Sequence, residues 1–238
     1  MKTVIDIVLL VIIALCTWSG YKRGVIGGLA SLLAIVIAIF GGTMLSSAYA
    51  GEVIPALEPF VDGYIDSQKN RDAVLADMGY AMSDKSLNDI LEADPSLRYD
   101  YAYLCLDKLG FHPERSVELA QKAVDYSNTN GADMTKSVVA VLCDTVTYVG
   151  ALTIAFLLIL IALVAIANVG NLSFRLPNLE IVDEIGGSVL GFIRGLVYCV
   201  LLCWVLTFFG IIIGKGTLND TILGNFFLSF RFITKGLL

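Results

Sequence analysis

The sequence predicts an all-α integral membrane protein with four transmembrane helices and a small acidic helical insert between helices 2 and 3. Of its 238 residues, 57% are hydrophobic and only 16% are charged, which makes the chain more apolar than a soluble domain. The charges are also segregated, because residues 51–135 hold sixteen acidic and seven basic residues, leaving six acids and nine bases elsewhere. We therefore expect one part of the chain to face water and the rest to face lipid.

The four predicted spans are stretches without charged residues, near the length of about 20 residues that a helix needs to cross about 30 Å of hydrocarbon. In chain order they are 7–21, 24–51, the stretch that leads from Thr145 to Arg175, and 195–214. The third is expected to be helical over 136–168 and to project into water at its start, since it is longer than the bilayer is thick. Residues 179–185 are expected to lie along the membrane surface. The predicted domains are thus a hairpin over 1–50, the insert over 51–135, helices 3 and 4 over 136–214, and an amphipathic tail over 215–238.

The insert has apolar residues three and four positions apart, as in Leu57, Val61 and Ile65, and this spacing predicts four or five short helices. His112 and Pro113 are typical of a helix start. Small residues at Ala48 and Ala50 would suit a signal peptidase, and cleavage after Ala50 would release the acidic domain. The apolar stretch before them is long for a signal peptide, so we expect no cleavage.

Four charged residues are predicted to lie at the membrane interface or to set topology. Lys22 and Arg23 lie in the shortest loop, which is therefore predicted to be cytoplasmic, with residues 51–135 on the outer side. The inverted orientation stays open. Asp6 is expected at the interface, near the start of the first span. Arg194 is expected to extend its side chain to cytoplasmic headgroups, the alternative being burial against Asp183, Glu184 or a lipid phosphate.

Two sets of glycines recur four residues apart near the start of predicted spans. At helical spacing they form faces without side chains, along which another backbone can approach closely inside lipid. We therefore predict helix packing, within one chain or between chains, at Gly20, Gly24, Gly28, Gly187, Gly191 and Gly195.

No stretch of the sequence matches a nucleotide-binding glycine loop, a His-Glu zinc motif or a serine nucleophile motif. His112 is the only histidine, and the five cysteines form no C-x-x-C pair. Among those cysteines, Cys105 is expected to meet water. The chain also offers no basic surface for nucleic acid. We therefore predict a protein that is not an enzyme, with no catalytic, cofactor-binding or metal-binding residues.

Two motifs carry a resemblance to a known family. One is Asp6 followed by an apolar helix into Gly20-Tyr21-Lys22-Arg23-Gly24, and the other runs from Leu176-Pro177 through Gly186, Gly187 and Gly191 to Arg194-Gly195. In both, the chain resembles the CvpA (colicin V production protein) family of bacterial inner-membrane proteins. The resemblance implies a multi-pass inner-membrane protein with a role in the production or export of a secreted toxin and in envelope homeostasis. It implies no established biochemical activity, and the insert is longer than the compact family pattern.

The favoured hypothesis is a membrane scaffold or accessory protein that associates in the lipid bilayer with copies of itself or with other envelope proteins. The alternative is a small oligomeric channel or transporter built around polar residues such as Asn168, Asn171 and Arg194. The centre of the third predicted span is uniformly apolar, whereas transporters usually have polar or broken helices near the midplane. The scaffold is therefore preferred.

Overall fold

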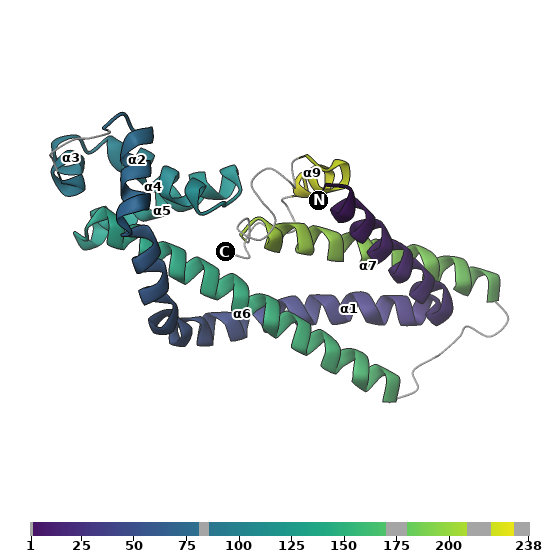
Figure 1. Cartoon of the computed structure of the whole chain (residues 1–238). Coiled ribbons are helices and arrows are strands. Elements are labelled where there is room, and N and C mark those ends of the chain that lie inside the picture. The colour runs from purple at the N-terminus through teal and green to yellow at the C-terminus, as the bar shows by residue number, and fades with distance from the viewer. Residues whose placement is uncertain (1, 81–85, 170–179, 209–219, 231–238) are drawn as a thin grey trace. The chain divides into compact units, whose positions relative to one another are not determined.

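The computed structural model describes residues 2–80, 86–169, 180–208 and 220–230, and within these ranges the regular elements are all helices (Figure 1). The chain divides into two compact units, which are described separately. The apolar unit comprises Met1–Ala48, Gly150–Leu206 and Gly216–Leu238. The polar unit comprises Tyr49–Val149 and Thr207–Lys215. Helices α1 and α6 each contribute to both units.

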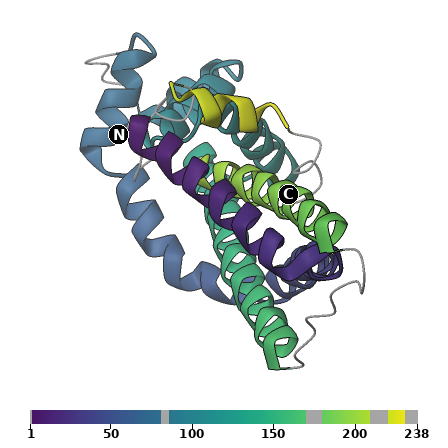
Figure 2. The same cartoon turned by 90° about the vertical axis from the view of Figure 1, so that its right-hand side faces the viewer.

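Helix α1, Lys2–Ile65, is interrupted at Gly24, whose φ of 71° and ψ of −175° lie outside helical geometry. The interruption leaves two helical segments, residues 2–23 and 25–65, which we call the first and second segments of α1. Figures 1 and 2 show that the chain turns back between them. Glycine is suited to this position because positive φ costs it little, whereas a side chain would clash with the backbone.

Among the described residues, three helices are long and apolar enough to cross a membrane: α1, α6 (Met134–Val169) and α7 (Glu180–Leu206). The sequence predicted four, because it counted residues 7–21 and 24–51 as separate spans, and both of these stretches lie in α1. Helix α6 agrees within two residues with the predicted helix over 136–168.

The start of α7 lies within the segment predicted along the membrane surface, before the predicted span over 195–214, and residues 209–214 of that span lie outside the described residues. The helix begins at Glu180 and continues without a break to Leu206. Glu180 and Asp183 lie in its first turn, where carboxylates are stabilised by the positive end of the helix dipole.

The polar unit contains the end of α1 and four short helices. The polar unit begins at Tyr49, close to the predicted start of the insert at residue 51, and the second segment of α1 continues into it through Pro55 and Pro59 to Ile65. As expected, Pro113 occupies the first turn of a helix preceded by His112. The short helices are α2 (Gln68–Asp77), α3 (Leu87–Ala93), α4 (Leu97–Lys108) and α5 (Pro113–Asn130).

The core of the polar unit forms where α4 packs against α5 and the start of α6. Tyr101 is 1% exposed, and its hydroxyl is hydrogen-bonded to that of Thr135 at 3.0 Å. Leu106 on α4 and Leu119 on α5 are buried to the same degree. Cys105 is buried as well, which corrects the expectation that it meets water, and burial raises the pKa of its thiol to about 11. The thiol is therefore a packing group at neutral pH.

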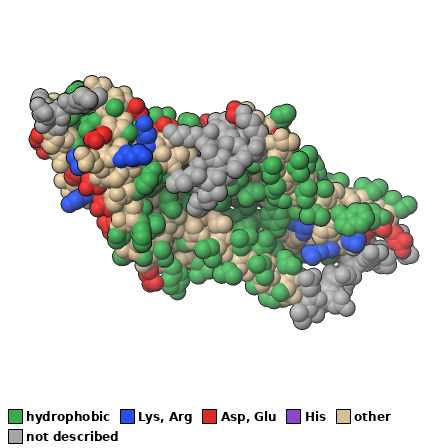
Figure 3. Space-filling model, in the orientation of Figure 1, with side chains coloured by type: hydrophobic (Ala, Val, Ile, Leu, Met, Phe, Trp, Pro, Cys, Tyr) green, Lys and Arg blue, Asp and Glu red, His purple; other side chains and the backbone are tan. Residues whose placement is uncertain are grey.

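Within the apolar unit, α7 is the most enclosed helix. In the most hydrophobic stretch of each helix, 39% of the residues of α7 are buried, against 22% in α1 and 11% in α6. Large apolar side chains such as Phe40, Leu158 and Ile161 point outward. Figure 3 shows hydrophobic side chains over most of this unit's visible surface. Such a surface suits lipid, because a soluble protein rarely exposes so large an apolar patch.

Candidate functional site: a glycine-faced interface between α1 and α7

The first segment of α1 and α7 run antiparallel with their backbones in close contact. The distance between the two backbones is seen by placing an ideal Cβ on each glycine. A Cβ on Gly20 would lie 2.8 Å from Cα of Gly191, and one on Gly187 would lie 2.8 Å from Cα of Gly24. At Gly195 the Cβ would lie 3.0 Å from Cα of Ile13. Real Cβ atoms essentially never approach backbone atoms within 3.0 Å, so only glycine fits at the centre of this interface.

The structure places all six predicted packing glycines in close surroundings, but not as two continuous stripes. Gly24 lies at the break in α1, so Gly20 and Gly28 are on different helical segments. The prediction of one stripe through Gly20, Gly24 and Gly28 is therefore wrong. A Cβ on Gly28 would meet the side chain of Leu190 at 2.8 Å, and one on Gly24 would meet the carboxylate of Asp183 at 2.6 Å.

Asp183 connects α7 to the break in α1. Its side chain is 2% exposed, and its Oδ1 accepts a hydrogen bond from the backbone N–H of Val25 at 2.8 Å. Val25 begins the second segment of α1, where the first N–H groups have no acceptor within their own helix. A carboxylate is stabilised at such a terminus both by the hydrogen bond and by the helix dipole. Asp183 thus acts as a helix cap supplied by another helix.

Arg194 lies inside the same interface. Its side chain is 8% exposed, its Nη2 donates to the carbonyl oxygen of Cys16 at 3.4 Å, and its Nε has no hydrogen-bond partner. This burial disagrees with the expectation that Arg194 extends to the headgroups. Its position one turn from Gly191 explains the difference, because the close approach of the first segment of α1 covers the guanidinium.

Further polar contacts flank the interface. The hydroxyl of Tyr21 donates to Oε2 of Glu184 at 3.0 Å, and the thiol of Cys199 donates to the carbonyl of Leu9 at 3.6 Å. These contacts extend the pairing of the first segment of α1 with α7 beyond its glycine centre.

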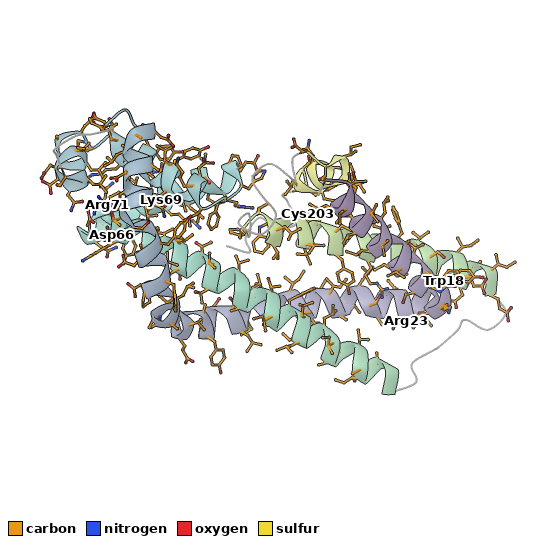
Figure 4. The ribbon with its side chains drawn as sticks, viewed as in Figure 1. Trp18, Arg23, Asp66, Lys69, Arg71 and Cys203 are labelled. Carbon is orange, nitrogen blue, oxygen red and sulfur yellow. The ribbon has the colours of Figure 1, made fainter. Side chains whose placement is uncertain are left out.

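Lys22, Arg23 and Asp6 are the other residues that were predicted to lie at the membrane interface or to set topology. The Lys22 ammonium lies 5.2 Å from the ring centroid of Trp18, and Arg23, labelled with Trp18 in Figure 4, is half-buried beside the break. Asp6 is half-buried, and its Oδ1 accepts from the backbone N–H of Leu223 at 3.1 Å, at the start of α9 (Ile222–Leu228). Asp6 therefore positions a helix of the C-terminal region.

The role of Asp183 is not predictable from the sequence. The sequence suggests Asp183 only as a possible partner of Arg194, and nothing local marks it as the cap of a helical segment that begins 158 residues earlier. Asn171, Leu176 and Pro177 lie outside the described residues, as does the side chain of Asn168. The predicted absence of catalytic, cofactor-binding and metal-binding residues stays a prediction.

The family model described as Colicin V production protein matches residues 5–78. The resemblance to the CvpA family is confirmed over these residues, which contain the first of the two motifs and not the second. The CvpA-matched region contains the break at Gly24, most of α1 and all of α2. It thus includes one side of the glycine-faced interface and the first part of the polar unit. No curated protein and no solved structure matches the chain.

Proposed function

We propose that this protein is a non-enzymatic membrane scaffold or accessory protein of the bacterial cell envelope, acting in the production or export of a secreted toxin of the colicin V type. The observation that carries the proposal is the glycine-faced interface, supported by the family match over residues 5–78. Close backbone packing fixes two helices against each other inside lipid. The outer faces of α1 and α6 then remain available to protein partners or to copies of this chain.

The proposed topology has four crossings, with α1 supplying two of them. The first segment of α1, residues 2–23, is about 33 Å long at 1.5 Å per residue, enough to cross the hydrocarbon core. The contact of Gly187 with Gly24 supports a common side for the break and the start of α7. We assign that side to the cytoplasm of the inner membrane because it carries Lys22 and Arg23. The polar unit then lies outside.

The proposal of a non-enzymatic role is supported by what the polar groups of the interface do. Asp183 caps a helix, Tyr21 bonds Glu184 and Arg194 bonds a backbone carbonyl. Each of these groups stabilises the pairing of the helices. A catalytic set would instead place an acid, a base or a nucleophile within reach of a common reacting atom.

The test combines secretion with crosslinking in the native host. Cells that lack this protein and carry a colicin V-type toxin operon should secrete less toxin, and the wild-type chain should restore secretion. Crosslinking in native membranes should capture envelope proteins or a second copy with the wild-type chain, and less of them with Gly191→Leu. Unchanged secretion in cells without the protein would remove the proposed role. Solute flux through vesicles that contain only this protein would favour the channel alternative instead.

A further inference from the structure

The apolar unit contains a groove of about 370 Å³ between both segments of α1, α6 and α7. Its walls are almost entirely hydrophobic, with the Tyr198 side chain at one end. Within a membrane, such a groove is filled by apolar matter, because water would find few hydrogen-bond partners there. The residues that line it are Ile12, Ile39, Leu152, Thr153, Phe156, Leu157, Leu160, Tyr198, Leu201, Leu202, Trp204 and Val205.

One end of the groove leads to Arg194. Tyr198 and Ile12 line the groove, and one helical turn beyond them along their own helices are Arg194 and Cys16. Arg194 donates to the carbonyl of Cys16, so its guanidinium joins the two helices directly beyond the apolar walls. The cation is thus at the end of the groove rather than inside it.

The guanidinium of Arg194 at this end is incompletely bonded. Nε of Arg194 is buried without a hydrogen-bond partner, which is costly for a charged group. Tyr198, which lines the groove, lies one helical turn from Arg194 on α7. In Figure 3, Lys and Arg side chains gather beside the hydrophobic surface of this unit. An anionic group at this point would meet the guanidinium of Arg194 and the hydroxyl of Tyr198.

We propose that the groove binds an acyl chain of an anionic membrane phospholipid, whose phosphate is held by Arg194 and the hydroxyl of Tyr198. The guanidinium group offers planar pairs of donors that match phosphate oxygens. The break in α1 lies on the proposed cytoplasmic side, and basic sites between helices on that side suit anionic headgroups. The inference rests on the proposed membrane insertion and is independent of the role in toxin export.

The test is native mass spectrometry of the full chain in mild detergent with added phosphatidylglycerol or phosphatidylcholine. The wild-type chain should retain phosphatidylglycerol in preference to phosphatidylcholine. Arg194→Gln should weaken phosphatidylglycerol binding roughly tenfold, as expected for the loss of one charge-assisted hydrogen bond. Lys22→Gln is the matched control, because it removes a positive charge at the same end of the helices, from an exposed side chain outside the groove. It should bind as the wild type does.

A second variant tests the apolar part of the site without changing charge. Leu201→Trp adds a larger side chain to the groove wall and should lower retention of phosphatidylglycerol, with an unchanged thermal unfolding midpoint in lipid-free detergent. Equal retention of the two lipids by the wild type would overturn the proposal, as would unchanged binding by folded Arg194→Gln. If Leu201→Trp instead abolished a crosslinked dimer and left lipid retention unchanged, the groove would belong to a second copy of the chain. If Arg194→Gln loses lipid binding and the cells still secrete toxin normally, the result supports the lipid site and shows that toxin export does not depend on it.

Discussion

A side chain at Gly24 would meet two obstacles, one in the backbone and one in the surrounding space. The φ of 71° at this residue is unfavourable for an L-residue with a Cβ, at a cost of about 1–2 kcal/mol. The Cβ would also lie 2.6 Å from the buried carboxylate of Asp183. Displacing the carboxylate would also break its hydrogen bond with the backbone N–H of Val25, which caps the second segment of α1.

We therefore expect Gly24→Ala to lower the free energy of unfolding by at least about 2 kcal/mol, as the strain and the weakened cap combine. Denaturant unfolding of the purified protein in detergent measures the change. Gly51→Ala is the control, because a Cβ there meets nothing within 4 Å in a helical stretch, and alanine should be neutral or stabilising by up to about 1 kcal/mol. Equal stability of Gly24→Ala and Gly51→Ala would contradict the assigned break.

Cys105 permits a residue-scale prediction about pH. Burial raises the pKa of its thiol to about 11, and only the thiolate reacts with maleimides and iodoacetamide at useful rates. The folded protein should therefore show almost no modification of Cys105 at pH 8, with the rate rising as the pH approaches 11 under conditions in which the fold persists. Peptide mass spectrometry measures the modified fraction, and unfolded protein serves as the control. Rapid modification at pH 8 in the folded state would show that the thiol is accessible after all.

At the scale of elements, Gly191 tests whether α1 and α7 depend on backbone contact. A Cβ on Gly191 would lie 3.0 Å from Cα of Gly20 and 3.1 Å from Cα of Thr17, so the longer leucine side chain would force the helices apart. Hydrophobicity cannot restore the lost contacts inside lipid. Gly191→Leu should destabilise the apolar unit by about 1–3 kcal/mol or more, as overpacked cores do.

Val197→Leu is the matched control, since it adds one methylene to the same helix at a position that is only half-buried. A crosslink between cysteines introduced at Thr17 and Ser188 reports the pairing directly, because α1 residues near Thr17 and α7 residues near Gly191 are adjacent. Gly191→Leu should lower the crosslinked fraction, and Val197→Leu should not. If both variants retain the wild-type crosslink and membrane level, the glycines are not required for the pairing.

Sequence patterns predicted some elements well because the signal was local. The long apolar run of α6 predicts a helix by itself, and the spacing of Gly187, Gly191 and Gly195 indicates a close approach before any partner is known. The start of α7 lies before the charge-free stretch that predicted the fourth span, because its acidic residues form the first helical turn and Asp183 is buried as a cap for another helix. The apolar spacing over residues 57–65 predicted a helix there, but nothing local shows that it continues the preceding span, since Pro55 and Pro59 usually end or kink a helix. The role of Asp183 could not be predicted because its partner Val25 is far away in the sequence.

At the scale of the whole molecule, the property to test is the side of the membrane that each unit occupies. The chain suits a labelling experiment, because all five of its own cysteines are buried and should give a low background. Asp94 is exposed in the polar unit and Lys22 is exposed near the break in α1, so a cysteine at either position should be reactive. In the proposed topology an odd number of crossings separates the two positions. They should therefore differ in access.

We expect an impermeant maleimide to label Asp94→Cys in cells whose outer membrane is permeabilised and whose inner membrane is intact, and to label Lys22→Cys only after lysis. The physical reason is that Lys22 and Arg23, in the shortest loop, favour retention of that loop in the cytoplasm. Labelling of each variant after lysis controls for thiol burial. The reverse pattern would show that the orientation is inverted and would place the positive end of the lipid groove on the outer side. Labelling of both positions in intact cells would show that they share one side, which four crossings do not allow.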